Sequence, residues 1–248
     1  YSRLDAVGAI HADDAERLIA LGVRQQVLTV TGDVRYDQVW QRALAVDRSS
    51  ALLSPLGSER FTIVAGSTWP ADEAPLLEAW LMLRARRTEA RLIIAPHEPT
   101  TDHLRPIEHW ARANSLSLAR LSSADAARAD VILVDRVGVL GELYVLADVA
   151  FVGGGFHAAG LHSVLEPATF GAPVLFGPRH ENSRDAALLI ERHGGAAAGS
   201  ASAIAGHLIE WAESENSRAE AGSRALSVVR EGLGAAERSL ALVLRLLA

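Results

Sequence analysis

Short apolar runs alternate with helical patterns along most of this 248-residue chain. Between residues 61 and 193 the alternation is regular, and each apolar run is followed by a stretch with helical periodicity. The runs are rich in β-branched residues and apolar at consecutive positions, as in strands that helices cover on both faces. The pattern predicts strands at 6–10, 26–30, 61–65, 91–95, 131–134, 149–152 and 173–176. It predicts helices at 13–21, 37–46, 72–87, 101–114, 138–147, 163–170, 182–193, 202–214 and 217–247.

The repeated strand–helix units predict the fold class. Right-handed crossovers between such units build an open parallel sheet, so we predict an α/β fold with a doubly wound, Rossmann-like sheet. A loop rich in Ser, Pro and Gly at 47–59 interrupts the rhythm. We therefore place an internal boundary within residues 32–58.

Composition narrows the classes of function. The net charge of −6 argues against a nucleic-acid-binding surface, which needs a basic excess. The absence of cysteine excludes a disulfide framework, a thiolate metal site and a cysteine nucleophile. No run approaches the roughly 20 apolar residues that span a bilayer, so no transmembrane segment is predicted. The chain does not begin with methionine, and we expect it to be a fragment of a longer protein.

Polar and small residues follow two of the predicted strands, where ligands of open parallel sheets bind. The turn Gly66-Ser67-Thr68 leads into a helix and is suited to presenting backbone N–H groups to a phosphate. The alternative is a plain turn whose hydroxyl caps the helix. His97 and Glu98 stand between two prolines in a stiff loop. His97 is either a ligand contact or an incidental polar residue of an exposed loop.

The strongest local signal follows the strand at 149–152. Three glycines, at 153–155, let a ligand approach the backbone closely. Ser163 is a predicted N-cap, so the next helix would direct free N–H groups at an anion. Glu166 then accepts hydrogen bonds from ribose hydroxyls or, alternatively, completes a capping box with Ser163. His162 is a candidate base or phosphate contact, with a purely structural role as the alternative.

Other site classes have little support in the sequence. There is no HxH, HExxH or Asp-x-Asp pattern, so no metal site is predicted. The P-loop signature, the dinucleotide-binding glycine fingerprint and the Gly-x-Ser-x-Gly elbow are also missing. After the strand at 173–176, Arg179 and Asn182 either close the site or belong to a surface turn.

Taken together, the strand-end motifs resemble one family, the Kdo (3-deoxy-manno-octulosonic acid) transferases, which are inverting glycosyltransferases of GT-B architecture. The resemblance runs from about residue 5 to about residue 195, and its order of motifs makes it specific. Two departures are Ser163, where the family usually has Asn, and Val139, where many members have Glu. The segments that carry the resemblance are 31–37, 65–70, 95–99, 135–144, 147–154, 162–166 and 176–178.

The resemblance implies a division of labour within a longer protein. Residues 1–45 are then a remnant of the N-terminal acceptor domain and hinge, and residues 46–248 the C-terminal domain that binds CMP-Kdo. The implied reaction transfers Kdo from CMP-Kdo to a lipid A precursor in lipopolysaccharide biosynthesis, with CMP as product. The full-length protein is expected in the cytoplasm, peripheral to or anchored at the bacterial inner membrane. The catalytic base of the family lies in the N-terminal domain, so we expect no catalytic residue here and no activity of this chain alone.

The resemblance also assigns roles to the candidate residues. Glu166 is expected to hold the cytidine ribose, while the amides of Gly154 and Gly155 and the helix near Ser163 stabilise the departing phosphate. Neither a metal nor a cofactor is expected. Two alternatives remain open: a GT-B donor domain for a UDP-sugar, and a non-catalytic nucleotide-sensing domain. The predicted substrate-binding residues are Gly66, Ser67, Thr68, Pro96, His97, Glu98, Gly138, Gly154, Gly155, His162, Ser163 and Glu166.

Overall fold

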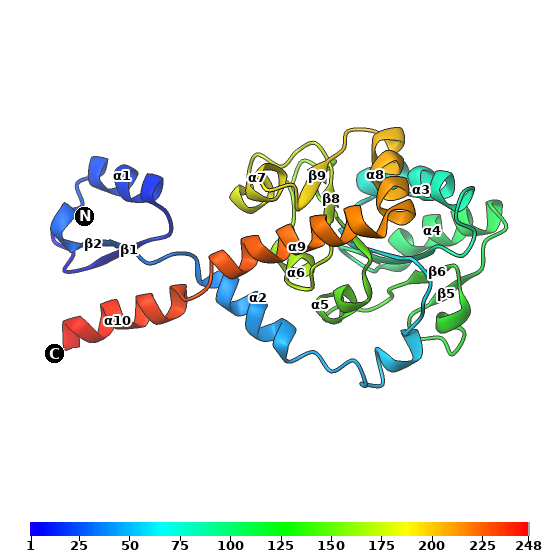
Figure 1. Ribbon diagram of the computed structural model, residues 1–248, viewed down its shortest axis with the longest axis horizontal. Helices are drawn as coiled ribbons and strands as arrows, with labels where there is room; N and C mark the ends of the chain where they lie inside the picture. The colour runs from blue at the N-terminus through cyan, green and yellow to red at the C-terminus, as the bar shows by residue number, and fades with distance from the viewer. Residues whose placement is uncertain (248) are drawn as a thin grey trace. The chain divides into compact units, whose positions relative to one another are not determined.

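The computed structural model describes residues 1–247 (Figure 1). These residues divide into two compact units. The first contains Tyr1–Leu44 together with the segment that begins at Val229, and the second contains Ala45–Val228. That residues 1–45 are the remnant of a preceding domain stays a prediction.

The second unit is built on a parallel sheet of seven strands in the order β5-β6-β4-β3-β7-β8-β9. This confirms the predicted α/β, doubly wound fold class. The strands are β3 (Thr62–Thr68), β4 (Arg91–Pro96), β5 (Leu118–Arg120), β6 (Val131–Leu133), β7 (Val149–Val152), β8 (Val174–Phe176) and β9 (Gly195–Ala197).

Helices cover both faces of this sheet. Neighbouring residues of a strand point to opposite faces, so Ile63 packs in one apolar core and Val64 in the other. The first core includes side chains of α3, α4 and α8, and the second includes α5 and the short turns near it. The helices are α3 (Pro70–Arg84), α4 (Thr101–Ala113), α5 (Leu140–Leu143), α6 (Leu165–Thr169), α7 (Arg184–Glu191), α8 (Ala201–Glu213) and α9 (Glu215–Glu231). The 3₁₀ turns are η2 (Ser54–Leu56), η3 (Ala126–Arg128) and η4 (Tyr144–Leu146).

The strand order places a topological switch point beside β3. The chain runs from β3 through β4 to the edge strand β5 and its neighbour β6, and then returns to β7 on the other side of β3. Crossovers on the two sides of such a point leave opposite faces, which opens a crevice beyond the carboxyl ends of β3 and β7. The topology therefore identifies this crevice as the place to look for a ligand site.

The first unit contains a short parallel pair of strands. In it the carboxylate of Asp37 accepts the backbone N–H groups of Gly234 (2.7 Å) and Ala236 (2.8 Å), which fixes the start of α10. Its elements are β1 (Val7–Ala9), α1 (Ala12–Ala20), η1 (Gln25–Val27), β2 (Leu28–Val30), α2 (Val34–Leu44) and α10 (Ala235–Leu247).

Two predicted helices differ from the structure, and two strands were missed. The single helix at 217–247 is wrong, because the chain turns between α9 and α10, where Gly234 has a φ of +87°. The edge strands β5 and β9 were not predicted, since neither contains a β-branched residue. The helix at 138–147 is a single turn, α5, continued by η4. Among residues 1–247, no helix is both long and apolar enough to cross a membrane.

Candidate functional site

The turns after β3, β4 and β7 are joined at the carboxyl edge of the sheet. The backbone N–H of Gly153 donates to the carbonyl of Gly66 at 2.9 Å, which joins the turns after β7 and β3. The backbone N–H of His97 donates to the carbonyl of Thr68 at 2.9 Å, which joins the turns after β4 and β3. The structure thus brings together the three segments that the sequence singled out.

Four aromatic rings from these turns form one cluster, the ring cluster of Trp69, His97, His157 and His162. The ring of Trp69 stacks on His157 with centroids 4.3 Å apart and an interplanar angle of 8°. It also stacks on His97 at 4.6 Å, and His97 stacks on His162 at 4.6 Å. Flat ring faces at a strand-end crevice offer a stacking surface for a planar ligand such as a nucleobase.

The hydrogen bond between Trp69 and His162 defines the state of the imidazole. Trp69 Nε1 lies 3.3 Å from His162 Nε2, and an indole N–H is only a donor. His162 Nε2 must therefore accept, which leaves the ring neutral with its proton on Nδ1. Burial lowers the pKa of His162, the nearby imidazole of His97 lowers it further, and the carboxylate of Asp72 opposes them. Both observations describe a neutral histidine at pH 7.

Asp72 is a buried carboxylate, 0% exposed, at the centre of these turns. Its Oδ2 accepts the backbone N–H groups of Trp69 (2.9 Å) and Gly154 (2.8 Å), and its Oδ1 accepts that of Phe156 (2.9 Å). We predicted that the amide of Gly154 stabilises a phosphate. This prediction is wrong, because that N–H group already donates to the carboxylate of Asp72. The part of Gly154 and Gly155 in lining a ligand pocket stays a prediction.

The glycine run serves close packing of backbone on backbone. A Cβ on Gly153 would lie 2.2 Å from the carbonyl oxygen of Ser67. A Cβ on Gly155 would lie 2.4 Å from the backbone nitrogen of Gly177. Neither gap admits a side chain, so these glycines allow the turns after β3, β7 and β8 to touch. The sequence prediction assigned this close approach to a ligand, but the partner in contact is protein backbone.

The segment around Ser163 differs from its prediction. The helix α6 begins at Leu165, its N-cap is Val164, and no side chain caps it. Ser163 is exposed and precedes the cap, so the predicted cap and capping box are wrong. Glu166 does lie in the first turn and is half-buried. Burial raises the pKa of Tyr144, and the charge of Glu166 adds to this, so the carboxylate lies near that phenol.

Other predicted site residues have structural partners. The hydroxyl of Thr68, which is fully buried, donates to Glu73 Oε1 at 2.8 Å. Burial raises the pKa of Glu73, and His103 Nε2 lies 3.1 Å from the same oxygen. Ser67 has a φ of +55°, so its backbone is left-handed where β3 turns into α3. Thr68 is therefore placed to support the turn, and its hydroxyl faces Glu73.

The last predicted residues lie at the rim. Pro96 is buried as the final residue of β4, while Glu98 is exposed and its carbonyl lies 3.0 Å from Nδ1 of His103. Gly138 is exposed after β6 with a φ of +86° and open space around it. That these residues contact a ligand stays a prediction.

A cavity of about 410 Å³ adjoins the ring cluster. His157 belongs to both, and the backbone N–H of Arg179 donates to the carbonyl of Gly155 at 2.9 Å. Its lining includes one guanidinium, that of Arg179, and one carboxylate, that of Glu181. Its lining residues are His157, Ala158, Ala159, Gly160, Arg179, Glu181 and Asn182.

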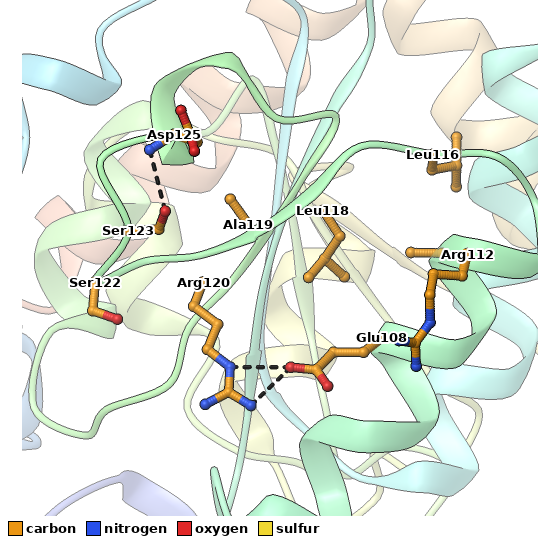
Figure 2. Close-up of a pocket in the computed structure, with 10 residues that line it drawn as sticks. Glu108, Arg112, Leu116, Leu118, Ala119, Arg120, Ser122, Ser123 and Asp125 are labelled. Carbon is orange, nitrogen blue, oxygen red and sulfur yellow. Dashed lines mark hydrogen bonds and ion pairs between the residues drawn. The ribbon is translucent and has the colours of Figure 1, made fainter.

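A second cavity, of about 520 Å³, lies by the edge strand β5 and α4 (Figure 2). There the guanidinium of Arg120 donates twice to Glu108 Oε1, at 3.0 and 2.8 Å. The charges of Arg120 and Glu108 therefore compensate each other in that cavity. The residues that line it lie at the β5 edge of the sheet, away from the switch point. We therefore assign the candidate site to the ring cluster.

Three central residues were missed by the sequence prediction: Trp69, Asp72 and His157. Trp69 lies within the segment 65–70 and His157 lies two residues after the glycine run 153–155, but neither is among the predicted site residues. A signal existed in the strand ends, where an aromatic ring or imidazole follows each of three neighbouring strands. Among residues 1–247, no group of three His, Asp or Glu side chains is arranged to hold a metal ion.

No protein-family model matches the chain. The 3-deoxy-D-manno-octulosonic acid transferase of Haemophilus influenzae is 26% identical over 98% of this chain and 57% of its own length. That of Aquifex aeolicus is 33% identical over 53% of this chain and 36% of its own length. The chain therefore spans only part of the length of the curated relatives it matches.

A solved structure of similar fold is the C-terminal CMP-Kdo binding domain of WaaA from Acinetobacter baumannii. The TM-score is 0.63 at 21% identity, and the match covers 78% of this chain and 98% of that one. At this identity the likeness establishes the fold.

Proposed function

Since the chain belongs to the family of 3-deoxy-D-manno-octulosonic acid (Kdo) transferases, we propose that it binds the nucleotide-sugar donor CMP-Kdo. The longer protein then transfers Kdo from this donor to a hydroxyl of a lipid A precursor in lipopolysaccharide biosynthesis, and CMP is released. The reaction inverts the configuration of the transferred sugar.

One observation carries the proposal. The turns after β3, β4 and β7 converge at the switch point and bring four rings together there. Ligands of doubly wound sheets bind at this position, and a cytosine base has the planar face that stacking requires. The solved domain of similar fold, that of WaaA from Acinetobacter baumannii, is a CMP-Kdo binding domain.

The chemistry of the rim suits a donor with a phosphate and a carboxylate. His162 carries its proton on Nδ1 and is able to donate it in a hydrogen bond to a phosphate oxygen. The guanidinium of Arg179 supplies a positive charge in the adjoining cavity, which suits either anionic group. Glu166 is half-buried and offers acceptors for the two ribose hydroxyls. Negative charge that builds on the departing phosphate is stabilised by these donors.

The base that activates the acceptor hydroxyl belongs, in this proposal, to a domain outside these residues. This chain alone then binds the donor without transferring Kdo. The same outer domain meets the lipid A precursor, and the full-length protein works from the cytoplasm at the bacterial inner membrane.

Isothermal titration with CMP, and with UMP as its competitor, tests the proposal. We expect CMP to bind and UMP to bind about tenfold more weakly. Uracil has a carbonyl oxygen where cytosine has its exocyclic amine, so a hydrogen bond donated by that amine is lost in UMP. Glu166→Ala is expected to weaken CMP binding by about tenfold through loss of the ribose contacts. Tighter binding of UMP would point to a UDP-sugar donor instead. The absence of a heat of binding for both nucleotides would refute the proposal. An unchanged CMP affinity in Glu166→Ala would show that Glu166 does not belong to the site.

A further inference from the structure

Asp72 has more partners than a helix cap requires. It is the third residue of α3, after Pro70 in the first position, and its bond to the backbone N–H of Trp69 is the capping bond of such a residue. A capping carboxylate on the surface would leave its remaining acceptors to water. Asp72 is 0% exposed, and its other acceptors are filled by protein.

Those other partners come from a distant part of the chain. The backbone N–H groups of Gly154 and Phe156 lie 82 and 84 residues further along, and both reach the carboxylate, at 2.8 and 2.9 Å. Charge-assisted bonds of this length are about twice as strong as neutral ones. The carboxylate therefore fixes the glycine turn after β7 against the start of α3. Its negative charge takes the place at these N–H groups that an anionic group of a ligand could otherwise have.

The backbone that Asp72 holds carries two members of the ring cluster. Trp69 supplies one of the three N–H groups, and His157 directly follows Phe156, which supplies another. The two rings stack at 4.3 Å and 8°, an alignment that a small shift of either turn would destroy. Trp69 in turn donates to His162, whose backbone N–H is bound at 3.1 Å by the carbonyl of Gly153.

We infer that Asp72 is a positioning residue for the donor: it holds the turns after β3 and β7 in register so that the rings of Trp69 and His157 form one stacking surface. Asp72 does not itself touch the nucleotide. The amides of Gly154 and Phe156 are engaged by Asp72, so the donor phosphate binds to other groups of the rim. This inference rests on the proposed function.

The test compares Asp72→Asn with Asp130→Asn, a substitution of a partly buried carboxylate at the opposite end of the sheet. Three quantities are measured on each folded variant: the midpoint of thermal unfolding, the affinity for CMP, and the amide hydrogen exchange of Gly154 and Phe156 by NMR. An asparagine has one acceptor oxygen and an NH₂ group that cannot accept, so at least one of the three N–H groups loses its partner. We expect Asp72→Asn to speed amide exchange at Gly154 or Phe156 about tenfold and to weaken CMP binding about tenfold.

Asp130→Asn is expected to lower the unfolding midpoint while leaving loop exchange and CMP affinity unchanged. Asp72→Glu serves as a second variant should Asp72→Asn not fold, since it keeps the charge but displaces it by one methylene. We expect the glutamate variant to fold and to bind CMP more weakly than the unmodified protein.

The outcomes separate the inference from the proposed function. Loop exchange and CMP affinity like those of the unmodified protein, in whichever Asp72 variant folds, would overturn the inference. Failure of the unmodified protein to bind CMP would overturn the proposed function and, with it, the role of Asp72 toward the donor. Amide exchange would still show in that case whether Asp72 holds the turn, so the two failures remain distinguishable.

Discussion

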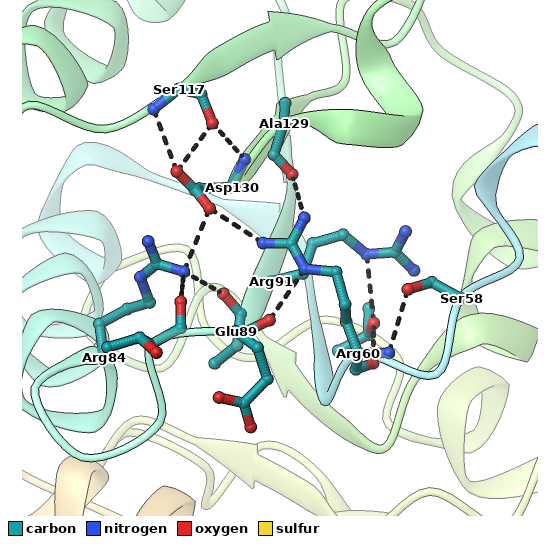
Figure 3. A network of polar contacts seen from close by, with 11 residues as sticks. Ser58, Arg60, Arg84, Glu89, Arg91, Ser117, Ala129 and Asp130 are labelled. Carbon is teal, nitrogen blue, oxygen red and sulfur yellow. Dashed lines mark hydrogen bonds and ion pairs between the residues drawn. The ribbon is translucent and has the colours of Figure 1, made fainter.

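The two ends of the same parallel strands are built from opposite kinds of chemistry. At the amino ends of β3, β4 and β6, the side chains of three arginines and an aspartate form a network of ion pairs and hydrogen bonds (Figure 3). At the carboxyl ends of β3, β4 and β7 lie the ring cluster, the glycine turn and the cavity of Arg179. Both ends carry polar residues, but at the amino end they bind one another, while at the carboxyl end His157 and Arg179 line a cavity.

The network at the amino end is centred on Asp130. Its Oδ1 accepts from Arg60 (2.9 Å) and forms an ion pair with Arg84 (3.1 Å), and its Oδ2 accepts from the hydroxyl of Ser117 (2.7 Å). Nearby, Arg91 is 1% exposed and donates to the carbonyl of Leu56 at 2.8 Å. Burial lowers the pKa of Arg91 to about 10, with the charge of Arg60 adding to the effect, so it stays protonated at pH 7.

This difference separates stability from binding. Buried charges are tolerated only when partners fill their bonding capacity, and the amino end meets that condition with protein atoms. A binding site needs donors, acceptors and apolar surface that are available to a ligand. Substitutions at the amino end should therefore act mainly on folding, and substitutions at the carboxyl end mainly on the ligand.

The largest effect on stability is expected for Arg91→Ala. It removes the donor that satisfies the buried carbonyl of Leu56 and leaves a cavity where the side chain packed. We expect the free energy of unfolding in urea to fall by about 3 kcal/mol. The CMP affinity of the folded variant should change by less than about twofold, because the two regions are separate. A large loss of affinity in this variant would break the separation proposed here.

A smaller loss of stability is expected for Gly153→Ala, at the carboxyl end. The added methyl would lie 2.2 Å from the backbone oxygen of Ser67, which forces the turns after β3 and β7 apart. Overpacking of this kind costs about 2 kcal/mol of unfolding free energy. Here CMP affinity should fall as well, by at least about tenfold.

Gly141→Ala is the matched control, since its methyl meets nothing within 4 Å. We expect this control to keep its CMP affinity and to lose no stability. If Gly153→Ala kept the CMP affinity of the unmodified protein, the spacing of the two turns would be unimportant for the ligand.

The next effect is a dependence of stability on acid pH through Asp130. Burial raises the pKa of this carboxyl, but the hydrogen bonds from Ser117 and the charges of Arg84 and Arg60 lower it more, and the net direction is down. The stabilisation by a group with a depressed pKa is complete above its unfolded value, near 4, and is lost as pH falls through the folded value.

Between pH 5 and pH 2 the unmodified protein should therefore lose more stability than Asp130→Asn, with a difference of about 1 kcal/mol. Parallel curves for the two proteins would contradict the role given to this carboxylate.

The smallest effect is expected in the titration of His162. The pKa of His162 is lowered, so this imidazole should titrate below 6.5 in the folded protein. The stability that the neutral imidazole contributes is therefore lost as pH falls below about 6.5. Trp69→Phe keeps a ring but removes the N–H that bonds the neutral imidazole, so the pKa of His162 should rise toward its ordinary value. NMR titration of the imidazole measures this directly. Trp40→Phe, in the first unit, serves as the control, and a pKa of His162 equal in both variants would contradict the hydrogen bond.

Much of the fold could be predicted because buried parallel strands have a simple signature. The runs at 61–65, 91–95 and 149–152 are apolar throughout, since helices cover both faces of the sheet. By contrast, Gly195–Ala197 forms the edge strand β9 without a single β-branched residue, and only pairing with β8 makes it a strand. Such a strand depends on its neighbour and has no local signal.

The site could be located from the sequence but not detailed. Strand-end motifs identified turns that the structure brings together, because the ends of parallel strands meet at one edge. The role of Asp72 depends on partners more than 80 residues away, and the stacking of Trp69 on His157 joins two different turns. Local spacing carries no information about either contact. Ser163 shows the reverse error, since a good capping residue precedes a helix that begins two residues later.

The central claim is that the carboxyl end of the sheet is the nucleotide site, and NMR of the labelled protein during a titration with CMP tests it most directly. We predict that signals of His97, His157 and His162 move with a single affinity, while the N–H signals of Arg60 and Arg91 stay in place. Shifts confined to the amino-end network, or to the cavity of Glu108 and Arg120 at the sheet edge, would contradict the account.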